Sequence, residues 1–139
     1  MTILIVDDDP DARSVLKRFM EDLGHEAREA RDGQDGLDAA LRERPNAIIS
    51  DGLMPRMDGP RTLAAIQVLT PRIPCCFMTG HLGVYTEADL RTQGARAVFA
   101  KPFYVPEVAK VLRDIAGSVA AVRSGAMRSY GLTTTTQQA

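Results

Sequence analysis

The chain has 139 residues, which is enough for one compact domain with its own hydrophobic core. Its composition, 45% hydrophobic and 25% charged, is typical of a soluble globular protein, and a net charge of −1 gives no sign of a nucleic-acid-binding surface. No apolar run reaches the roughly 20 residues of a membrane helix. Carboxylates interrupt the first apolar stretch too early for a signal peptide. Cys75 and Cys76 are adjacent and cannot form a disulfide framework, so we expect a cytoplasmic protein in a reducing compartment.

The first part of the chain alternates short apolar runs with segments of helical periodicity. Ile3–Val6 is continuously apolar, as expected for a strand covered on both faces. After Pro10, apolar residues recur at spacings of three and four, which predicts a helix ending near Gly24. Asp9 stands directly before that proline and is predicted to cap the helix. A weaker strand is predicted at 26–30, followed by a second helix that ends before residue 45.

The same alternation continues through the rest of the chain. The predicted elements are a strand at Ala47–Ile49, a loop at Asp51–Gly59, a helix with Leu63, Ile66 and Leu69, a strand at Pro74–Met78, a helix near Thr86–Thr92, a strand at Ala97–Ala100 and a last helix reaching Val122. Strands that alternate with helices indicate an α/β fold with a parallel sheet. We predict a doubly wound, five-stranded, flavodoxin-like sheet with strand order 2-1-3-4-5 and five flanking helices.

The end of the chain differs in composition from the rest. Residues 123–139 contain glycines, serines, a run of threonines and two glutamines, with few apolar anchors. We therefore predict one folded domain over residues 1–122 and a polar tail or linker stub over residues 123–139.

Polar side chains follow the predicted strands at the points where these strands end. They are Asp7 and Asp8 after the first strand, Asp51 after the third, Thr79 after the fourth and Lys101 after the fifth. In an open α/β sheet, ligands bind beyond the carboxyl ends of the strands, so these groups should share one crevice. Clustered carboxylates repel one another unless a cation lies between them, and oxygen ligands suit Mg²⁺. The sequence therefore predicts a magnesium site.

The predicted site has the groups needed for phosphoryl transfer. Asp8 would bind Mg²⁺ directly and Asp7 directly or through a water molecule, and the backbone carbonyl of Leu53 would supply a further oxygen. Asp51 would attack phosphorus as the nucleophile and lie beside the ion. Two further residues, Lys101 and Thr79, would contact the phosphoryl oxygens.

These residues lie in four short motifs that resemble a known family. The motifs are Leu4-Ile5-Val6-Asp7-Asp8, Ile48-Ile49-Ser50-Asp51 with Met54-Pro55-x-Met57-Asp58-Gly59 after it, Met78-Thr79-Gly80, and Ala100-Lys101-Pro102-Phe103. Their order and spacing are similar to the receiver domains of two-component response regulators, over about residues 1 to 122. The resemblance implies that Asp51 is the phosphoacceptor, that Asp7 and Asp8 bind Mg²⁺, and that Thr79 moves toward the phosphoryl group. It also implies a cis bond between Lys101 and Pro102.

One position departs from the family pattern. Receiver domains often have a tyrosine or phenylalanine early in the fifth strand, whose ring rotates during switching, and here that position is Val98. Strand alternation points the neighbouring Phe99 to the opposite face. We therefore expect the signal to travel by movement of the loop and the fourth helix.

The resemblance also implies the partners. A sensor histidine kinase or a histidine phosphotransfer protein would supply the phosphoryl group. A downstream protein would read the face formed by helix 4, strand 5 and helix 5, and phosphorylation-dependent homodimerisation is a further option. Neither nucleic acid nor a membrane is an expected direct partner. Two alternatives remain: a Mg²⁺-dependent phosphohydrolase, for which the connections look too short, and an interaction module that acts without phosphorylation, which would not need the acceptor, acid pair and lysine retained here.

Overall fold

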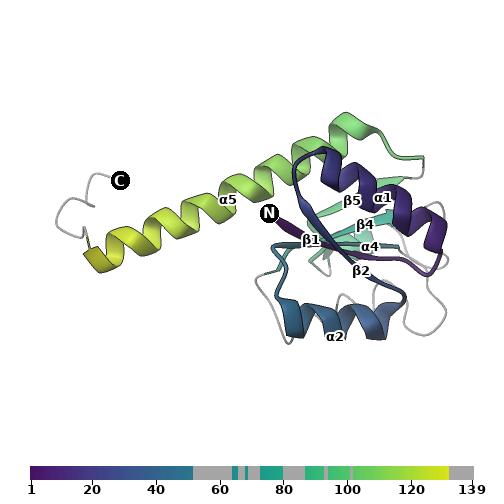
Figure 1. Ribbon diagram of the computed structural model, residues 1–139, viewed down its shortest axis with the longest axis horizontal. Helices are drawn as coiled ribbons and strands as arrows, with labels where there is room; N and C mark the ends of the chain where they lie inside the picture. Colours follow the sequence, from purple (N-terminus) through teal and green to yellow (C-terminus); the bar gives the residue numbers. More distant parts are fainter. Residues whose placement is uncertain are drawn as a thin grey trace.

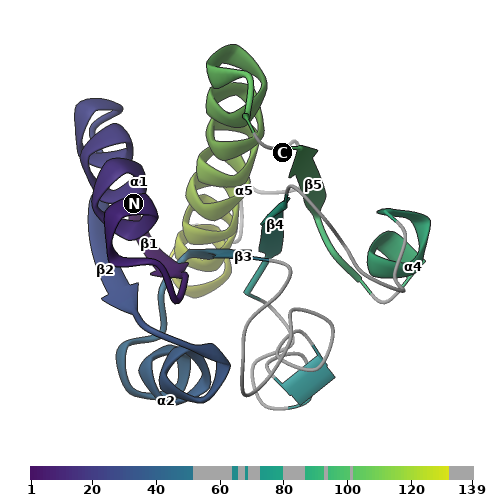
Figure 2. The ribbon, with the colours of Figure 1, turned by 90° about the vertical axis from the view of Figure 1, so that its right-hand side faces the viewer.

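The computed structural model describes residues 1–51, 64–65, 68, 73–79, 87–92, 94–100 and 102–131, without the side chains of residue 79 and residues 121–131. The elements are β1 (Thr2–Val6), α1 (Pro10–Asp22), β2 (Glu26–Ala30), α2 (Gly33–Glu43), β3 (Ala47–Asp51), β4 (Cys75–Thr79), α4 (Glu87–Thr92), β5 (Ala97–Ala100) and α5 (Val105–Gly131). The strands form one parallel sheet in the order β2-β1-β3-β4-β5; Figure 1 shows the whole chain, and Figure 2 labels all five strands. The predicted fold class and strand order are confirmed.

The sheet separates two hydrophobic clusters, because successive side chains of a strand point to opposite faces. On one face, residues such as Leu4, Ile48 and Phe77 pack with side chains of α2 and α4. On the other face, residues such as Ile5 and Met78 pack with side chains of α1 and α5. Figure 2 shows the sheet between these two pairs of helices. Burial on both faces explains why β1, β3 and β4 are nearly continuous apolar runs in the sequence.

The edge strand β2 is mostly polar. Its two alanines, Ala27 and Ala30, join the clusters on opposite faces of the sheet, while Glu26, Arg28 and Glu29 are exposed. Charged side chains on an edge strand discourage pairing with another chain. This explains why the sequence signal for the strand was weak.

The last helix extends farther than the sequence predicted. Near its start, Val108, Leu112 and Ile115 are buried against the sheet, and the helix then runs on to Gly131, well beyond the sheet (Figure 1). Residues 123–131 are therefore helical, which corrects the predicted end of the last helix at Val122. Glycine and serine each cost a helix about 1 kcal/mol or less, too little to end one that contains alanine and methionine.

Candidate functional site

The strand register brings three of the predicted site residues, Asp7, Asp51 and Thr79, to one edge of the sheet. Val6 of β1 pairs with Ser50 of β3, so Asp7 and Asp51 occupy the next positions on neighbouring strands. Across β4, Asp51 pairs with Met78, and Thr79 follows it as the last residue of that strand. The three carboxyl ends therefore meet as predicted.

Three carboxylates converge at this edge. Asp7, Asp8 and Asp51 each offer a carboxylate oxygen, and these oxygens all lie within 4.8 Å of one another. Asp7 is buried, Asp51 is half-buried and Asp8 is exposed, so the cluster opens to solvent on one side. Two unit charges about 5 Å apart repel by about 3 kcal/mol at an effective dielectric constant near 20, which favours a cation between them.

The donor set fits a small, hard cation. All three side chains supply oxygen, and the exposed side of the cluster leaves room for the water ligands that Mg²⁺ usually keeps. Oxygens on opposite sides of Mg²⁺ are about 4.2 Å apart, because each Mg–O distance is about 2.1 Å. Of three ligands around an octahedral ion, at least two pairs are adjacent, with oxygens about 3.0 Å apart, so the carboxylates would draw closer together to share one ion.

The loop after β1 is ordered by local hydrogen bonds. Asp9 is the N-cap of α1, its carboxylate accepts from the backbone N–H of Asp11 at 2.9 Å, and Pro10 is the first helical residue. This confirms the predicted helix cap at Asp9. The Asp7 Oδ1 atom in turn accepts from the N–H of Asp9 at 2.9 Å.

The environment of Asp51 is set by the end of β3. Its predecessor Ser50 is 2% exposed and donates its hydroxyl to the Asp51 carbonyl at 3.1 Å. The strand therefore ends with a hydrogen-bonded backbone carbonyl and a half-buried carboxylate.

Several predicted site residues fall outside the described part of the chain. Leu53 and Lys101 lie there, and so does the peptide bond that joins Lys101 to Pro102. Thr79 is described as the end of β4, without its side chain. On β5 it pairs with Ala100, the residue before Lys101.

The two sides of β5 differ as the sequence predicted. Val98 packs in the cluster that contains Leu90 of α4, whereas Phe99 packs in the cluster of α1 and α5. Val98, which the resemblance matches to the family's aromatic position, is buried on the α4 face, and the ring of Phe99 faces the other layer.

Neither cysteine has the properties of a reactive thiol. Cys75 and Cys76 are 1% and 0% exposed, on opposite faces of β4. Burial raises the pKa of each thiol to about 12, so both remain protonated at neutral pH. Their role is core packing, as the sequence indicated.

The structure adds a residue that the sequence did not single out. Arg13, on the first turns of α1, donates from Nη1 to the backbone carbonyl of Asp7 at 2.8 Å. Its Nε atom lies 3.3 Å from Oε1 of Glu29 on β2. An arginine in a helix usually indicates a solvated charge, and no spacing rule pointed to this contact.

Comparison with known proteins agrees with this geometry. Residues 3–113 match the response regulator receiver domain family. The transcriptional regulatory protein PrrA of Mycobacterium tuberculosis is 32% identical over 106 residues, covering 76% of this chain and 46% of PrrA. Among solved structures, a receiver domain from Clostridium thermocellum superposes with a TM-score of 0.81 at 22% identity, covering 87% of this chain and 98% of that one. That likeness supports the fold.

A further solved structure bears on the acidic cluster. The receiver domain of a sensor histidine kinase from Pseudomonas aeruginosa, with a magnesium ion coordinated in its active-site cleft, has a TM-score of 0.75 and 26% identity, covering 84% of this chain and 97% of that one.

The chain belongs to the response regulator receiver domain family, and its domain is a signalling domain of two-component systems. It spans about half or less of the length of the curated relatives that it matches. Among the described residues, no helix combines the length and the apolar character needed to cross a membrane.

Proposed function

We propose that this domain is a phosphoacceptor switch, in which Asp51 takes a phosphoryl group from a phosphohistidine while Mg²⁺ is bound beside it. The observation that carries the proposal is the convergence of Asp7, Asp8 and Asp51 at the carboxyl edge of the sheet. The magnesium-containing cleft of the Pseudomonas aeruginosa receiver domain supports the choice of ion.

Asp7, Asp8 and the carboxylate of Asp51, together with the backbone carbonyl of Leu53, would hold the ion. When bound, Mg²⁺ would neutralise negative charge on the phosphoryl oxygens and orient the group for in-line attack. The buried Asp7 fixes one side of the site, and the exposed Asp8 leaves the other side open to water and to the incoming phosphoryl group.

In the transfer step, a carboxylate oxygen of Asp51 forms a bond to phosphorus while the phosphorus–nitrogen bond of the phosphohistidine breaks. The electron pair of that bond stays on the imidazole nitrogen, and the product on this chain is an acyl phosphate. Lys101 would pair with the phosphoryl oxygens and the Thr79 hydroxyl would donate a hydrogen bond to one of them. The domain carries out this transfer and a slow hydrolysis of its own acyl phosphate, and it is not a turnover enzyme.

The phosphorylated site would act on partners through the neighbouring helix. Movement of Thr79 would pull on the segment before α4 and so change the shape of the face formed by α4, β5 and α5. Because residue 98 is a valine, this change would not depend on the rotation of an aromatic ring there. Tyr104, directly before α5, and Val105, its first residue, are 68% and 47% exposed and offer apolar contact area there. We propose a histidine kinase or phosphotransfer protein as the donor and a downstream protein as the reader, in the cytoplasm. Phosphorylation-dependent homodimerisation is one form that the output could take.

We also propose that the folded receiver unit ends near Val122 and that residues 123–139 contribute little to its stability. Ile115 of α5 is buried in the core cluster, and Val119, one turn later, is half-buried. A chain that ends at Val122 should keep its thermal midpoint within about 3 °C of the full chain, and a loss of more than about 10 °C would contradict this boundary.

The test of function is intact-mass analysis after incubation with acetyl phosphate, with and without Mg²⁺. We expect one phosphoryl adduct that requires Mg²⁺ and is absent in Asp51→Asn. If wild-type protein binds Mg²⁺ but forms no adduct, the phosphoacceptor mechanism is wrong. The domain would then act as an interaction module without phosphorylation.

A further inference from the structure

Asp7, the first residue of the acid pair, is held in place by several hydrogen bonds. The N–H of Asp7 donates to the carbonyl of Ala30 on β2 at 3.1 Å, and its Oδ1 atom accepts from the N–H of Asp9 at 2.9 Å. Its carbonyl accepts from Nη1 of Arg13 at 2.8 Å. This carbonyl belongs to the peptide unit between Asp7 and Asp8. Its orientation therefore helps to set the direction in which the Asp8 side chain leaves the backbone.

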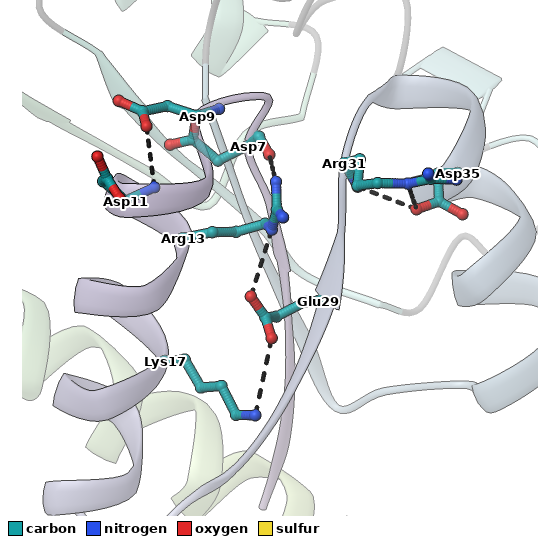
Figure 3. Close-up of polar contacts among 8 residues, drawn as sticks. All are labelled: Asp7, Asp9, Asp11, Arg13, Lys17, Glu29, Arg31 and Asp35. Atoms are coloured by element: carbon teal, nitrogen blue, oxygen red, sulfur yellow. Dashed lines mark hydrogen bonds and ion pairs between the residues drawn. The ribbon is translucent and has the colours of Figure 1, made fainter.

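Arg13 makes this contact from a fixed position. Its side chain is only 15% exposed, and its Nε atom pairs with Oε1 of Glu29 at 3.3 Å. Lys17, one turn later on α1, approaches Oε2 of the same carboxylate at 3.7 Å. Figure 3 shows Arg13 between the Asp7 carbonyl and Glu29, with Lys17 on the far side of Glu29.

The geometry suits a guanidinium group in particular. One nitrogen faces the carbonyl at the end of β1 and another faces a carboxylate on β2, so a single planar group links three elements: α1, β1 and β2. A lysine ammonium is a single point charge and cannot offer two donors in this fixed arrangement. The helix backbone supports the same loop, since the N–H of Arg13 donates to the carbonyl of Asp9 at 3.0 Å.

We propose that Arg13 is a positioning residue for the metal site, which holds the Asp7–Asp8 peptide so that both carboxylates face the ion, with Glu29 as its anchor. This inference rests on the proposed function, in which these two residues bind Mg²⁺. Groups that orient metal ligands without touching the metal commonly change metal affinity about 10- to 100-fold when they are removed.

The direction in which Mg²⁺ affinity changes when Arg13 is removed distinguishes a positioning role from an effect of its charge. A positive charge near the site repels Mg²⁺, so removal of Arg13 would tighten Mg²⁺ binding if its charge were all that mattered. Loss of positioning would weaken binding instead. If Arg13 only linked α1 to β2, its removal would lower the stability measured without Mg²⁺. The dissociation constant of the folded protein for Mg²⁺ would then stay unchanged.

The experiment is isothermal titration of Mg²⁺ into the full chain, with thermal midpoints recorded without Mg²⁺. Arg13→Met keeps an apolar stem and removes the guanidinium, and we expect its dissociation constant for Mg²⁺ to rise about tenfold. Arg13→Lys keeps the charge and is milder on folding, and we expect a rise of about threefold or more. Lys17→Met is the matched control, because it removes a cation from the same Glu29 carboxylate. Its dissociation constant should stay the same or fall slightly.

Provided that wild-type protein binds Mg²⁺, any of three results would overturn the inference. These are unchanged dissociation constants in both Arg13 variants, tighter Mg²⁺ binding in Arg13→Met, and a loss of Mg²⁺ affinity in Lys17→Met as large as in Arg13→Met. If wild-type protein binds no Mg²⁺ at all, the metal part of the proposed function fails, and the inference fails with it. Because the wild-type titration is read separately from the variants, the two failures are distinguishable.

Discussion

The close contact between α2 and β1 makes Gly36→Ala an informative perturbation. Gly36 is buried in α2, and a Cβ atom built there would lie 2.9 Å from Cγ2 and 3.0 Å from Cγ1 of Val6. Val6 is fully buried at the end of β1, directly before Asp7. Both methyl groups of Val6 face the glycine, and a β-branched side chain has little freedom to rotate away.

The expected cost follows from two opposing effects. Alanine is favoured over glycine inside a helix by about 0.8–1.0 kcal/mol. Overpacking of a well-filled core costs about 1–3 kcal/mol, because neighbouring groups must shift. Gly117 in α5 provides the control, since an added Cβ there meets no atom within 4 Å. Gly117→Ala should therefore raise the free energy of unfolding by the helix preference of alanine alone. Gly36→Ala also carries the cost of overpacking, so its free energy of unfolding should be about 1–3 kcal/mol lower than that of Gly117→Ala.

The assay is guanidinium unfolding followed by far-UV circular dichroism, because the chain has no tryptophan to report by fluorescence. We expect Gly117→Ala to unfold at a higher denaturant concentration than wild-type protein, and Gly36→Ala at a concentration no higher than wild-type. Equal stabilisation of both variants would refute the reasoning. It would mean that β1 and α2 can separate at no cost.

Three further predictions concern other parts of the domain. Asp9→Ala should lower the free energy of unfolding by about 1 kcal/mol without Mg²⁺, while Asp9→Asn should change it by only a few tenths, and equal losses would argue against the cap. Cys75 and Cys76, whose pKa values are raised to about 12, should react with a thiol-specific disulfide reagent at least about 100-fold more slowly in native protein than in denaturant, and rapid native labelling would contradict their burial. The pKa of His25 is lowered from 6.5 by burial and by the N-terminal amine, so its contribution to stability is present at higher pH and is lost as pH falls through 6.5 toward the folded-state value. His25→Gln should therefore lose less stability than wild-type protein between pH 8 and pH 5.5, and identical losses would exclude this contribution.

Much of the fold could be predicted because burial leaves a direct mark on the sequence. β1 and β4 lie between two layers of helices, and their continuous apolar runs followed from that environment. The carboxylate cluster could be predicted for a topological reason, since parallel strands deliver their carboxyl ends to one edge. The true end of α5 could not be predicted in this way. Residues 123–131 include two glycines and two serines and have few apolar anchors, so the sequence predicted a tail, yet the helix continues to Gly131.

The support of the site was not predictable because it depends on tertiary register. Arg13 reaches the Asp7 carbonyl and Glu29 only because β2 pairs with β1 so that Glu29 lies beside Ile5. From the sequence alone, an arginine in α1 and a glutamate on a polar strand are two ordinary surface charges. The same holds for Gly36, which looks like a helix-weakening residue until its contact with Val6 is known.

These two contacts act on the same short segment from opposite sides of the sheet. Gly36 lets α2 approach Val6 from one face, and Arg13, on the helix that covers the other face, holds the carbonyl of Asp7. A methyl group at residue 36 would push Val6 and move Asp7 against its bond to Arg13, so the cost of overpacking should extend to Asp7 and Asp8, the proposed metal ligands. A site that must hold several like charges close together before any ligand arrives needs such support, because the repulsion among the carboxylates would otherwise spread them apart. The position of the acid pair is therefore set as much by residues of α1, α2 and β2 as by the strand that carries it.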